Sequence, residues 1–246
     1  SLNFKSQFDS KWTQGVVESD SGVAGGTALE FDGVDDEVIA PYDASLLLTN
    51  LTLSGWVKRS RVVNNGAHNS LVSRDAGAGT QNYRLVIVDD GPSSTLLLSM
   101  RDTATGAHTL ATASGVAPAL NEWAHIVATY DGATKKIYMN GLEVASENDA
   151  FNPYQETTAP LTIGSGELGS RLMNGAIDDV RVYNRALSAD EIKRLYNSRG
   201  PVAHWNFDEG TGRYAYDSSR KSEDITTDLE AYWSMNDAGV DAEGET

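Results

Sequence analysis

The feature that most constrains this chain is a series of short runs rich in β-branched and aromatic residues, separated by turns that contain glycine, between residues 28 and 184. Most of these runs alternate apolar and polar residues with a period of two, which is typical of half-buried strands. The clearest runs are residues 51–58, 83–88, 95–100, 123–130, 136–139 and 176–183. Many short strands with little helical periodicity predict an all-β fold, a two-sheet antiparallel jelly-roll sandwich.

Two turns and one strand are especially informative. Asp131-Gly132 and Asn140-Gly141 supply the positive φ angles that tight hairpins need, so residues 122–147 are predicted to form a three-strand meander. In the strand at residues 51–58, Trp56 falls on the face opposite the aliphatic residues. We still expect Trp56 to be buried, because a tryptophan within a strand of a sandwich usually packs in a core.

One short helix is predicted near residues 188–197. Ser188 and Glu191 form a capping box, in which each side chain satisfies a free N–H group at the helix start. An apolar stripe at helical spacing follows, made of Ile192, Leu195 and Tyr196. Gly200-Pro201 is expected to end the helix and to separate two structural units.

The charge balance excludes some classes of partner. The 246 residues include 35 Asp and Glu against 19 Lys and Arg, a net charge of −16, which repels phosphate backbones and anionic headgroups. We therefore expect no nucleic-acid partner. There is no cysteine, which excludes disulfides, cysteine-ligated zinc and a thiol nucleophile. No apolar stretch approaches the about 18 residues of a membrane span, so no membrane insertion is expected. The first residues lack the apolar core of a signal peptide, and export would imply that the signal has been removed.

The last part of the chain differs from the rest in charge and repeats itself. Residues 201–246 carry 11 acidic and 3 basic side chains, which is half of the net charge in less than a fifth of the length. Residues 202–210 and 229–237 are similar segments, each an apolar strand that contains Trp and ends in acidic or amide residues. The sequence thus predicts an N-terminal segment at 1–27, a sandwich at 28–200 and an acidic C-terminal extension at 201–246.

Several segments together carry a family resemblance. In chain order they are residues 29–38, 51–58, 122–132, 137–141, 161–164 and 174–188. They resemble successive strands of the laminin-G-like jelly rolls of the concanavalin A-like lectin and glucanase superfamily, over about residues 28–197. The resemblance implies a noncatalytic adhesion or assembly module, extracellular or at the cell surface. The alternative is a carbohydrate-binding module attached to a polysaccharide-degrading enzyme.

The order of the segments departs from the family pattern. In similar domains the opening strand looks like residues 203–210, but here it follows the helix, and residues 1–24 contain nothing close to it. Either the chain is cut from a tandem array or the extension supplies a missing strand. We expect residues 201–246 to link successive units through strand addition to other copies or neighbouring domains, since an open sheet edge captures strands. The alternative is a truncated extension without structure.

Similar jelly rolls hold a structural calcium ion at the sandwich edge. Calcium takes six to eight oxygen ligands, and acidic pairs stand at several strand ends of this chain. Carried over by position, the resemblance implies ligands from Asp208, the Gly33 carbonyl and Asp178. Asn236 replaces Asp208 if the second similar segment closes the sandwich. The alternative is that these acids only increase solubility.

Catalysis is not expected. Glycosidases of this superfamily place paired carboxylates on one strand face, and the nearest candidate is Glu30-Phe31-Asp32 followed by Asp35. Gly33 predicts a turn there, and no strand has a second Glu–x–Asp run, so the chain is predicted not to be an enzyme. The glycine cluster at residues 164–169 matches a dinucleotide fingerprint, but a strand follows it where that site needs a helix.

Among the aromatic residues, Trp12 and Tyr154 are the candidates for stacking on a sugar, Tyr154 because it follows Pro153 in a polar loop.

Overall fold

The computed structural model describes Lys5–Gln7, Trp12–Gln14 and residues 27–62, 67–75, 81–102, 106–155, 159–166 and 171–197. The chain divides into two units, Ser1–Arg199 and Gly200–Thr246. The second unit lies wholly outside the described residues, and with it lie the predicted segments at 202–210 and 229–237.

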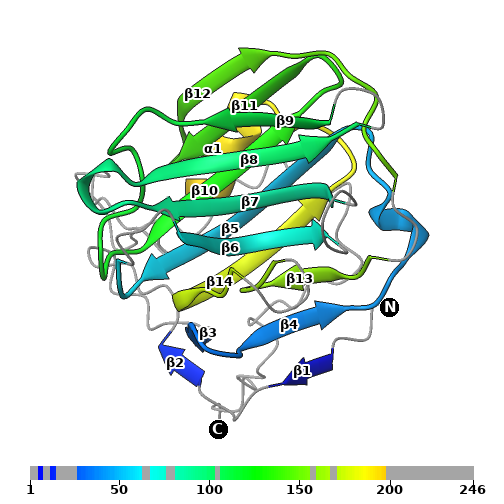
Figure 1. Cartoon of the computed structure of the whole chain (residues 1–246). Coiled ribbons are helices and arrows are strands. Elements are labelled where there is room, and N and C mark those ends of the chain that lie inside the picture. Colours follow the sequence, from blue (N-terminus) through cyan, green and yellow to red (C-terminus); the bar gives the residue numbers. More distant parts are fainter. Residues whose placement is uncertain are drawn as a thin grey trace, which may run out of the picture. The chain divides into compact units, whose positions relative to one another are not determined.

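The described part of the first unit is a sandwich of two seven-stranded antiparallel sheets (Figure 1). Sheet A contains, in spatial order, β1 (Lys5–Gln7), β4 (Glu37–Ala40), β13 (Leu161–Ile163), β6 (Ala67–Asp75), β7 (Gln81–Asp89), β8 (Thr95–Arg101) and β9 (Ala107–Ala111). Sheet B contains β12 (Leu142–Asn148), β11 (Thr134–Met139), β10 (Ala124–Tyr130), β5 (Leu51–Arg59), β14 (Asn174–Tyr183), β3 (Thr27–Asp32) and β2 (Trp12–Gln14). Two 3₁₀ turns, η1 (Ala44–Leu46) and η2 (Gly91–Ser93), lie between strands. The predicted fold class is confirmed.

The hairpin turns form where the sequence predicts them. Gly132 has φ of 96°, Asn140 52° and Gly141 76°, the left-handed region that these turns require. β10, β11 and β12 accordingly pair in succession as an antiparallel meander.

The core lies between the two sheets. β5 is apolar on the face that meets sheet A, and Leu51, Leu53 and Val57 on that face are fully buried. Opposite them are the buried aliphatic residues of sheet A, which include Leu71, Val72, Leu85, Ile87, Leu96 and Leu98. Each side chain of this size contributes about 1.5–3 kcal/mol when it leaves water, so the interlocked faces hold the sandwich together.

The predicted helix is α1 (Ala189–Asn197), and its capping box is present. The Ser188 N–H donates to Glu191 Oε2 at 2.8 Å, and the Glu191 N–H donates to Ser188 Oγ at 3.3 Å. The helix packs on the outer face of sheet B, where Tyr196 stacks on Trp56 with ring centroids 5.6 Å apart. Trp56 is 7% exposed, which confirms that it is buried. None of the helices among the described residues combines the length and apolar character that crossing a membrane requires.

Two strands come from the first 27 residues, where the sequence predicts only an N-terminal segment. β1 pairs with β4, with Lys5 opposite Ile39, and β2 pairs with β3, with Trp12 opposite Leu29. Both strands lie at sheet edges (Figure 1).

Candidate functional site

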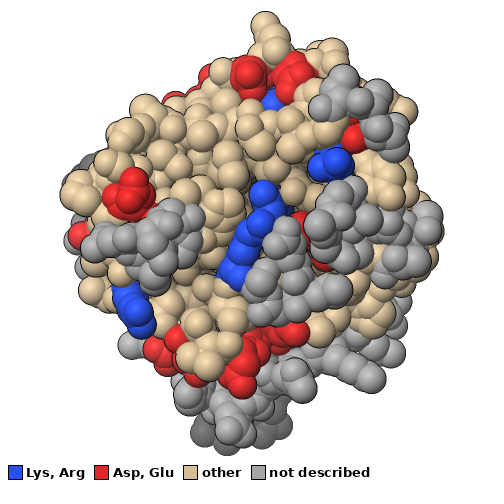
Figure 2. Space-filling model, in the orientation of Figure 1, with Lys and Arg blue, Asp and Glu red and all other residues tan. Residues whose placement is uncertain are grey.

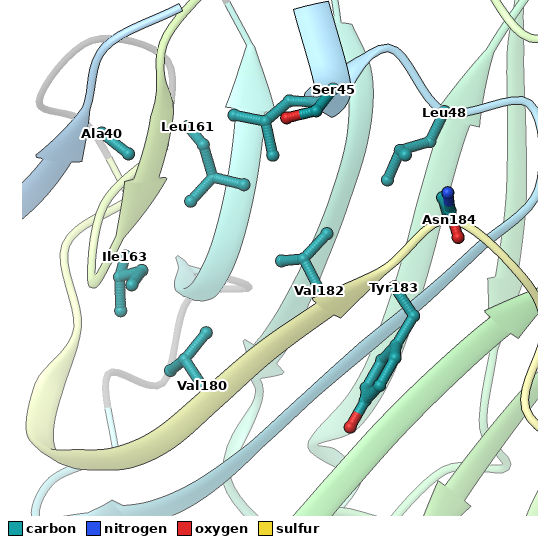
Figure 3. Close-up of a pocket in the computed structure, with 10 residues that line it drawn as sticks. Ala40, Ser45, Leu48, Leu161, Ile163, Val180, Val182, Tyr183 and Asn184 are labelled. Atoms are coloured by element: carbon teal, nitrogen blue, oxygen red, sulfur yellow. The ribbon is translucent and has the colours of Figure 1, made fainter. Parts of the chain in front are cut away.

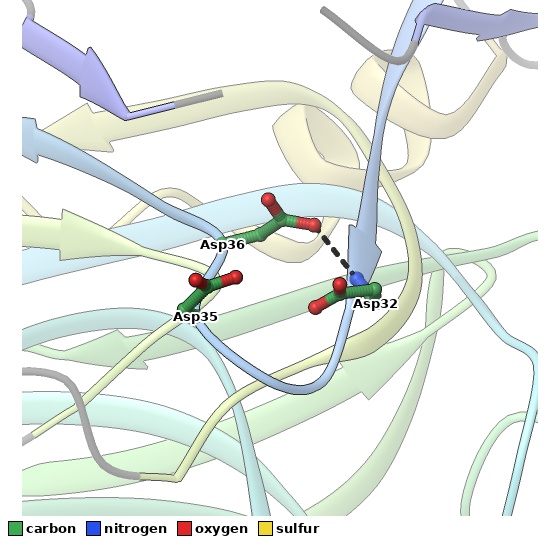
Figure 4. Close-up of side chains that lie close together, drawn as sticks. All are labelled: Asp32, Asp35 and Asp36. Carbon is green, nitrogen blue, oxygen red and sulfur yellow. Dashed lines mark hydrogen bonds between the residues drawn. The ribbon is translucent and has the colours of Figure 1, made fainter. Parts of the chain in front are cut away.

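The turn between β3 and β4 gathers three acidic side chains. Carboxylate oxygens of Asp32, Asp35 and Asp36 lie within 4.8 Å of one another (Figure 4). Asp36 Oδ2 accepts a hydrogen bond from the Asp32 N–H at 2.9 Å, and Asp32 Oδ1 accepts one from the Val34 N–H at 2.7 Å. Asp36 is the least exposed of the three acids. The turn therefore presents several carboxylate oxygens at one point of the surface.

Neighbouring residues hold this turn in place. Gly33 has φ of +77°, a conformation that other residues rarely adopt, and a Cβ atom there would lie 3.0 Å from the Asn174 Cβ. Asn174, the first residue of β14, donates from Nδ2 to the Asp32 carbonyl at 2.5 Å. The acidic turn of one strand is thus tied to the start of the next strand in the sheet.

The oxygens of this turn suit a hard divalent cation. Calcium is bound in proteins by carboxylates, backbone carbonyls and water, at six to eight oxygens in all. Three carboxylates supply about half of that number, and water would complete the shell at this exposed turn. Asp32, Asp35 and Asp36 are the residues that could hold such an ion.

The predicted metal ligands are only partly in this region. Gly33 lies within the acidic turn, as the prediction requires. Asp178 does not lie beside it, because the β3–β14 register places Asp32 opposite Asn174 and Asp178 four residues further along β14. At about 3.3 Å per residue, that separation is about 13 Å. Asp208 and Asn236 lie outside the described residues. The signal for the observed cluster was the density of acids around Gly33, with Asp32 before it and Asp35-Asp36 after it.

A polar cavity of about 460 Å³ adjoins the acidic turn. Its lining includes Asp32, Gly33, Arg61, His68, Arg171 and Asn174. Asn69 also lines it and is held from behind, because its Nδ2 donates to Asp89, which in turn accepts from Arg59 Nη1 at 2.6 Å. The cavity lining thus combines the guanidinium groups of Arg61 and Arg171 with the Asp32 carboxylate.

A row of polar residues also runs across the outer face of sheet A. The strand registers align Thr162, Ser73, Arg84, Ser99 and Thr109 across β13, β6, β7, β8 and β9. Figure 2 shows basic side chains in the middle of this face, with acidic side chains towards its rim.

Asp75 connects the polar row to the cavity. Its Oδ2 lies 3.7 Å from Arg84 Nη1, and the same oxygen lies 3.9 Å from Arg171 Nη1. Asp75 thus links Arg84 of the row to Arg171 of the cavity lining, while Ser73, Ser99 and Thr162 of the row are buried.

A protein-family model decides the family of this chain. The model described as concanavalin A-like lectin/glucanases superfamily, of the laminin G type, matches residues 32–193. The chain belongs to this superfamily. The predicted resemblance is confirmed, and the domain is laminin-G-like.

Curated relatives of the laminin-G-like domain are much longer proteins. It is 24% identical over 153 residues to adhesion G-protein coupled receptor V1 of Danio rerio, which covers 61% of this chain and 2% of the receptor. It is 26% identical over 176 residues to human pappalysin-1, which covers 67% of this chain and 11% of that protein. The chain therefore spans a small part of the length of these relatives.

Solved structures share the fold of the laminin-G-like domain. The binding domain of Paraclostridial Mosquitocidal Protein 1 has a TM-score of 0.59 at 17% identity, covering 80% of this chain and 47% of that one. The receptor binding domain of botulinum neurotoxin type G has a TM-score of 0.56 at 15% identity, covering 80% and 46%. At these identities the likeness concerns the β-sandwich alone.

The two aromatic ligand candidates lie apart from the acidic turn in the chain. Tyr154 is half-buried rather than fully exposed, and its N–H donates to the Arg101 carbonyl at 2.6 Å. Its own carbonyl accepts from Asn82 Nδ2 at 2.8 Å. The Trp12 backbone lies in β2 opposite Leu29.

The carboxylates considered for glycosidase chemistry have no acidic neighbour on the adjacent strand. Glu30 and Asp32 share one face of β3, and the residues opposite them on β14 are Ala176 and Asn174. A retaining glycosidase needs a second carboxyl group about 5–5.5 Å from the first. Neither partner position on β14 supplies one, and the acids near Asp32 are Asp35 and Asp36 of the turn rather than of a strand face.

Proposed function

We propose that this laminin-G-like domain is a noncatalytic, calcium-stabilised adhesion or assembly module of an extracellular or cell-surface protein. The observation that carries the calcium part is the cluster of Asp32, Asp35 and Asp36 in the β3–β4 turn. The adhesion or assembly part is supported by the family and by relatives that are long proteins, one of them named an adhesion receptor. A noncatalytic role is supported by the turn at Gly33, with φ of 77°, which ends β3 after Asp32 so that Asp35 does not continue the strand face of Glu30 and Asp32.

Calcium is expected to raise the melting temperature of the wild-type chain relative to the same protein in EDTA. A ligand that binds only the native state at a hundredfold excess over its Kd adds about 2.7 kcal/mol to the free energy of unfolding. In Asp35→Asn the calcium-dependent increase should be largely lost, because the amide keeps one oxygen but lacks the second carboxylate oxygen and the negative charge. The measurement is thermal unfolding in both solutions.

Asp178→Asn is the matched control. It removes an acid of β14, the strand next to β3, at a position about 13 Å along β14 from the residue opposite Asp32. Its melting temperature should still rise with calcium. If calcium stabilises Asp35→Asn fully and Asp178→Asn not at all, the ion binds at the position that the family resemblance implies. Identical melting of the wild type with calcium and with EDTA would remove the calcium proposal.

A second candidate function is glycan binding, which the cavity beside the acidic turn favours. Arg171 lines the cavity, with its Nη1 3.9 Å from Asp75 Oδ2, so it can contact a ligand that occupies the cavity. Because sugar hydroxyls are recognised by such donors and acceptors, Arg171→Ala should weaken binding to a glycan found on an array about tenfold. Arg185→Ala is the control, because Arg185 pairs with Glu191 on the helix and its side chain is 55% exposed.

The same preparation tests for catalysis. The wild type and Glu30→Gln should bind equally and release no reducing ends from glucan, galactan or xylan. Hydrolysis by the wild type that Glu30→Gln abolishes would contradict the noncatalytic proposal, and an array without any bound glycan would contradict the second candidate.

For assembly, we propose that the partner is another copy of the chain or a neighbouring domain, joined by strand addition. In this mode main-chain hydrogen bonds provide affinity, and alternate side chains provide specificity.

A further inference from the structure

β14 has one strand edge that is paired over only part of its length. On one side β14 pairs with β5 in both halves, but on the other side β3 pairs with residues 174–177 only. No described strand pairs with residues 180–183 on the β3 side. Burial follows the pairing, since residues 175–177 are buried and residues 178–183 are only partly buried. Among the strands that the structure describes, the second half of β14 is therefore an open edge of sheet B.

An apolar cavity lies directly behind this open edge. It measures about 460 Å³ and is formed by Leu161 and Ile163 of sheet A and Val180 and Val182 of β14, among others. Figure 3 shows these side chains directed from their two sheets into the space between them. Ile163, Val180 and Val182 pack against the main core but remain partly buried. The core of the sandwich is thus incompletely covered where the edge is open.

The open edge is protected against unselective pairing. A register shift interrupts the β14–β5 ladder between Asp178 and Arg181, and Asp179 has φ of +49°. The Arg181 guanidinium binds both carboxylate oxygens of Asp179, each at 2.9 Å. Bulges and charges of this kind discourage edge-to-edge association. A strand that docks here must therefore gain binding energy from apolar side chains that enter the cavity.

The chain contains a segment with the pattern that such a strand needs. In residues 229–237, Leu229, Ala231, Trp233 and Met235 fall on one face of an extended strand, and Glu230, Tyr232, Ser234 and Asn236 fall on the other. The similar segment at 202–210 has fewer apolar residues on its apolar face and begins five residues after α1.

The segment at 229–237 is the better one to reach another molecule. It is separated from the end of α1 by 31 residues. A linker of that length could span about 30 Å as a flexible coil, which is long enough for the segment to reach a neighbouring molecule.

We propose that the open edge of β14 accepts residues 229–237 of a second copy of this chain as an added antiparallel strand, with Trp233 and Met235 entering the apolar cavity. The inference rests on the proposed assembly role and names the site and the segment that perform it. Because the accepting edge and the donated segment are different parts of the chain, the contact is head-to-tail, and it builds an open series of copies unless the series closes into a ring.

The test uses the full chain and two double variants of the donated segment. Trp233→Ser with Met235→Ser alters the apolar face, and Tyr232→Ser with Ser234→Ala alters the opposite face of the same segment. Sedimentation velocity over a concentration series should show concentration-dependent association of the wild type. The apolar-face variant should weaken self-association by about thirtyfold, and the opposite-face variant should change it less than about threefold.

Amide hydrogen exchange locates the acceptor. Amides of residues 180–183 should exchange more slowly at the concentrations where copies associate, and a synthetic peptide of residues 229–237 should slow them in the monomeric apolar-face variant. A wild type that stays monomeric at every concentration would overturn the inference. Slow exchange at all concentrations that is lost in Trp205→Ser with Phe207→Ser would also overturn it, because the chain's own segment would then fill the edge.

Failure of this inference is distinguishable from failure of the proposed function. Calcium stabilisation and glycan binding are measured on the same variants, and the acidic turn and the cavity proposed for them contain none of the four residues that these variants replace. If both persist while self-association is absent, the domain remains a binding module that does not assemble through β14.

Discussion

Gly175→Ala is expected to lower the free energy of unfolding by about 4 kcal/mol, combining backbone strain with a clash inside sheet B. Gly175 has φ of +144°, and a Cβ atom there would lie 2.1 Å from the Lys58 carbonyl oxygen and 2.8 Å from the Arg59 Cα. Both are backbone atoms of β5, so neither can move aside without separating the two strands. Urea denaturation of the wild type and the variant measures the loss.

Gly106→Ala separates strain from clash. Gly106 has φ of +96°, and a Cβ atom added there would meet no heavy atom of the described residues within 4 Å. Alanine at this position therefore carries the strain alone and should cost about 1–2 kcal/mol. Equal losses in the two variants would show that sheet B adapts to the added methyl group. Gly175 also follows Asn174, which holds the acidic turn, so Gly175→Ala should in addition reduce the stabilisation by calcium.

Features that depend on neighbouring residues in the chain could be predicted from the sequence. The turn at Asn140-Gly141 and the capping box of Ser188 and Glu191 need only local backbone angles and hydrogen bonds, and both are present as predicted. The period of two in residues 51–58 likewise fixes which residues meet the core, because side chains alternate across a strand. The family resemblance then identified the sandwich.

Features that depend on strand register could not be predicted in the same way. Gly33 and Asp178 each stand next to acids in the sequence, but their separation follows from β3 pairing with residues 174–177 of β14. A shift of a few residues in that register would have brought them together, and nothing local determines the shift. The open edge at residues 180–183 and the alignment of Arg84 with Ser73 and Ser99 likewise result from pairing between distant segments.

The second large loss of stability is expected from disrupting a buried ionic network between β9, β11 and the end of β12. The Lys135 side chain is fully buried, and its Nζ lies 2.7 Å from Asp149 Oδ2 and 3.1 Å from Glu147 Oε2. Asp149 also accepts a hydrogen bond from His108 Nδ1 at 2.9 Å. Removing one member of a buried pair leaves the other charge without its partner, which costs about 3 kcal/mol. Asp149→Asn should therefore destabilise the domain by about this amount at neutral pH.

The difference between the wild type and Asp149→Asn should depend on pH. Partial burial alone would raise the pKa of Asp149, but hydrogen bonds from Lys135 and His108 outweigh it and hold that pKa below its ordinary value of 3.8. A carboxyl group with a lowered pKa in the folded state contributes stability that is complete above the unfolded pKa. That contribution is lost as the pH falls through the folded pKa, so the two unfolding curves should converge below about pH 4.

Glu143→Gln is the matched control, because it removes an acid from a neighbouring pair that is exposed to solvent. Lys136 Nζ and Glu143 Oε2 lie 2.9 Å apart, with the side chains 37% and 41% exposed. Exposed pairs contribute less than about 1 kcal/mol, so this variant should unfold close to the wild type at neutral pH. If Asp149→Asn were as stable as Glu143→Gln, Glu147 would be sufficient to neutralise Lys135. The contact with Asp149 would then only orient the Lys135 side chain. If its deficit instead persisted undiminished at pH 2, the loss would come from packing of the side chain rather than from its charge.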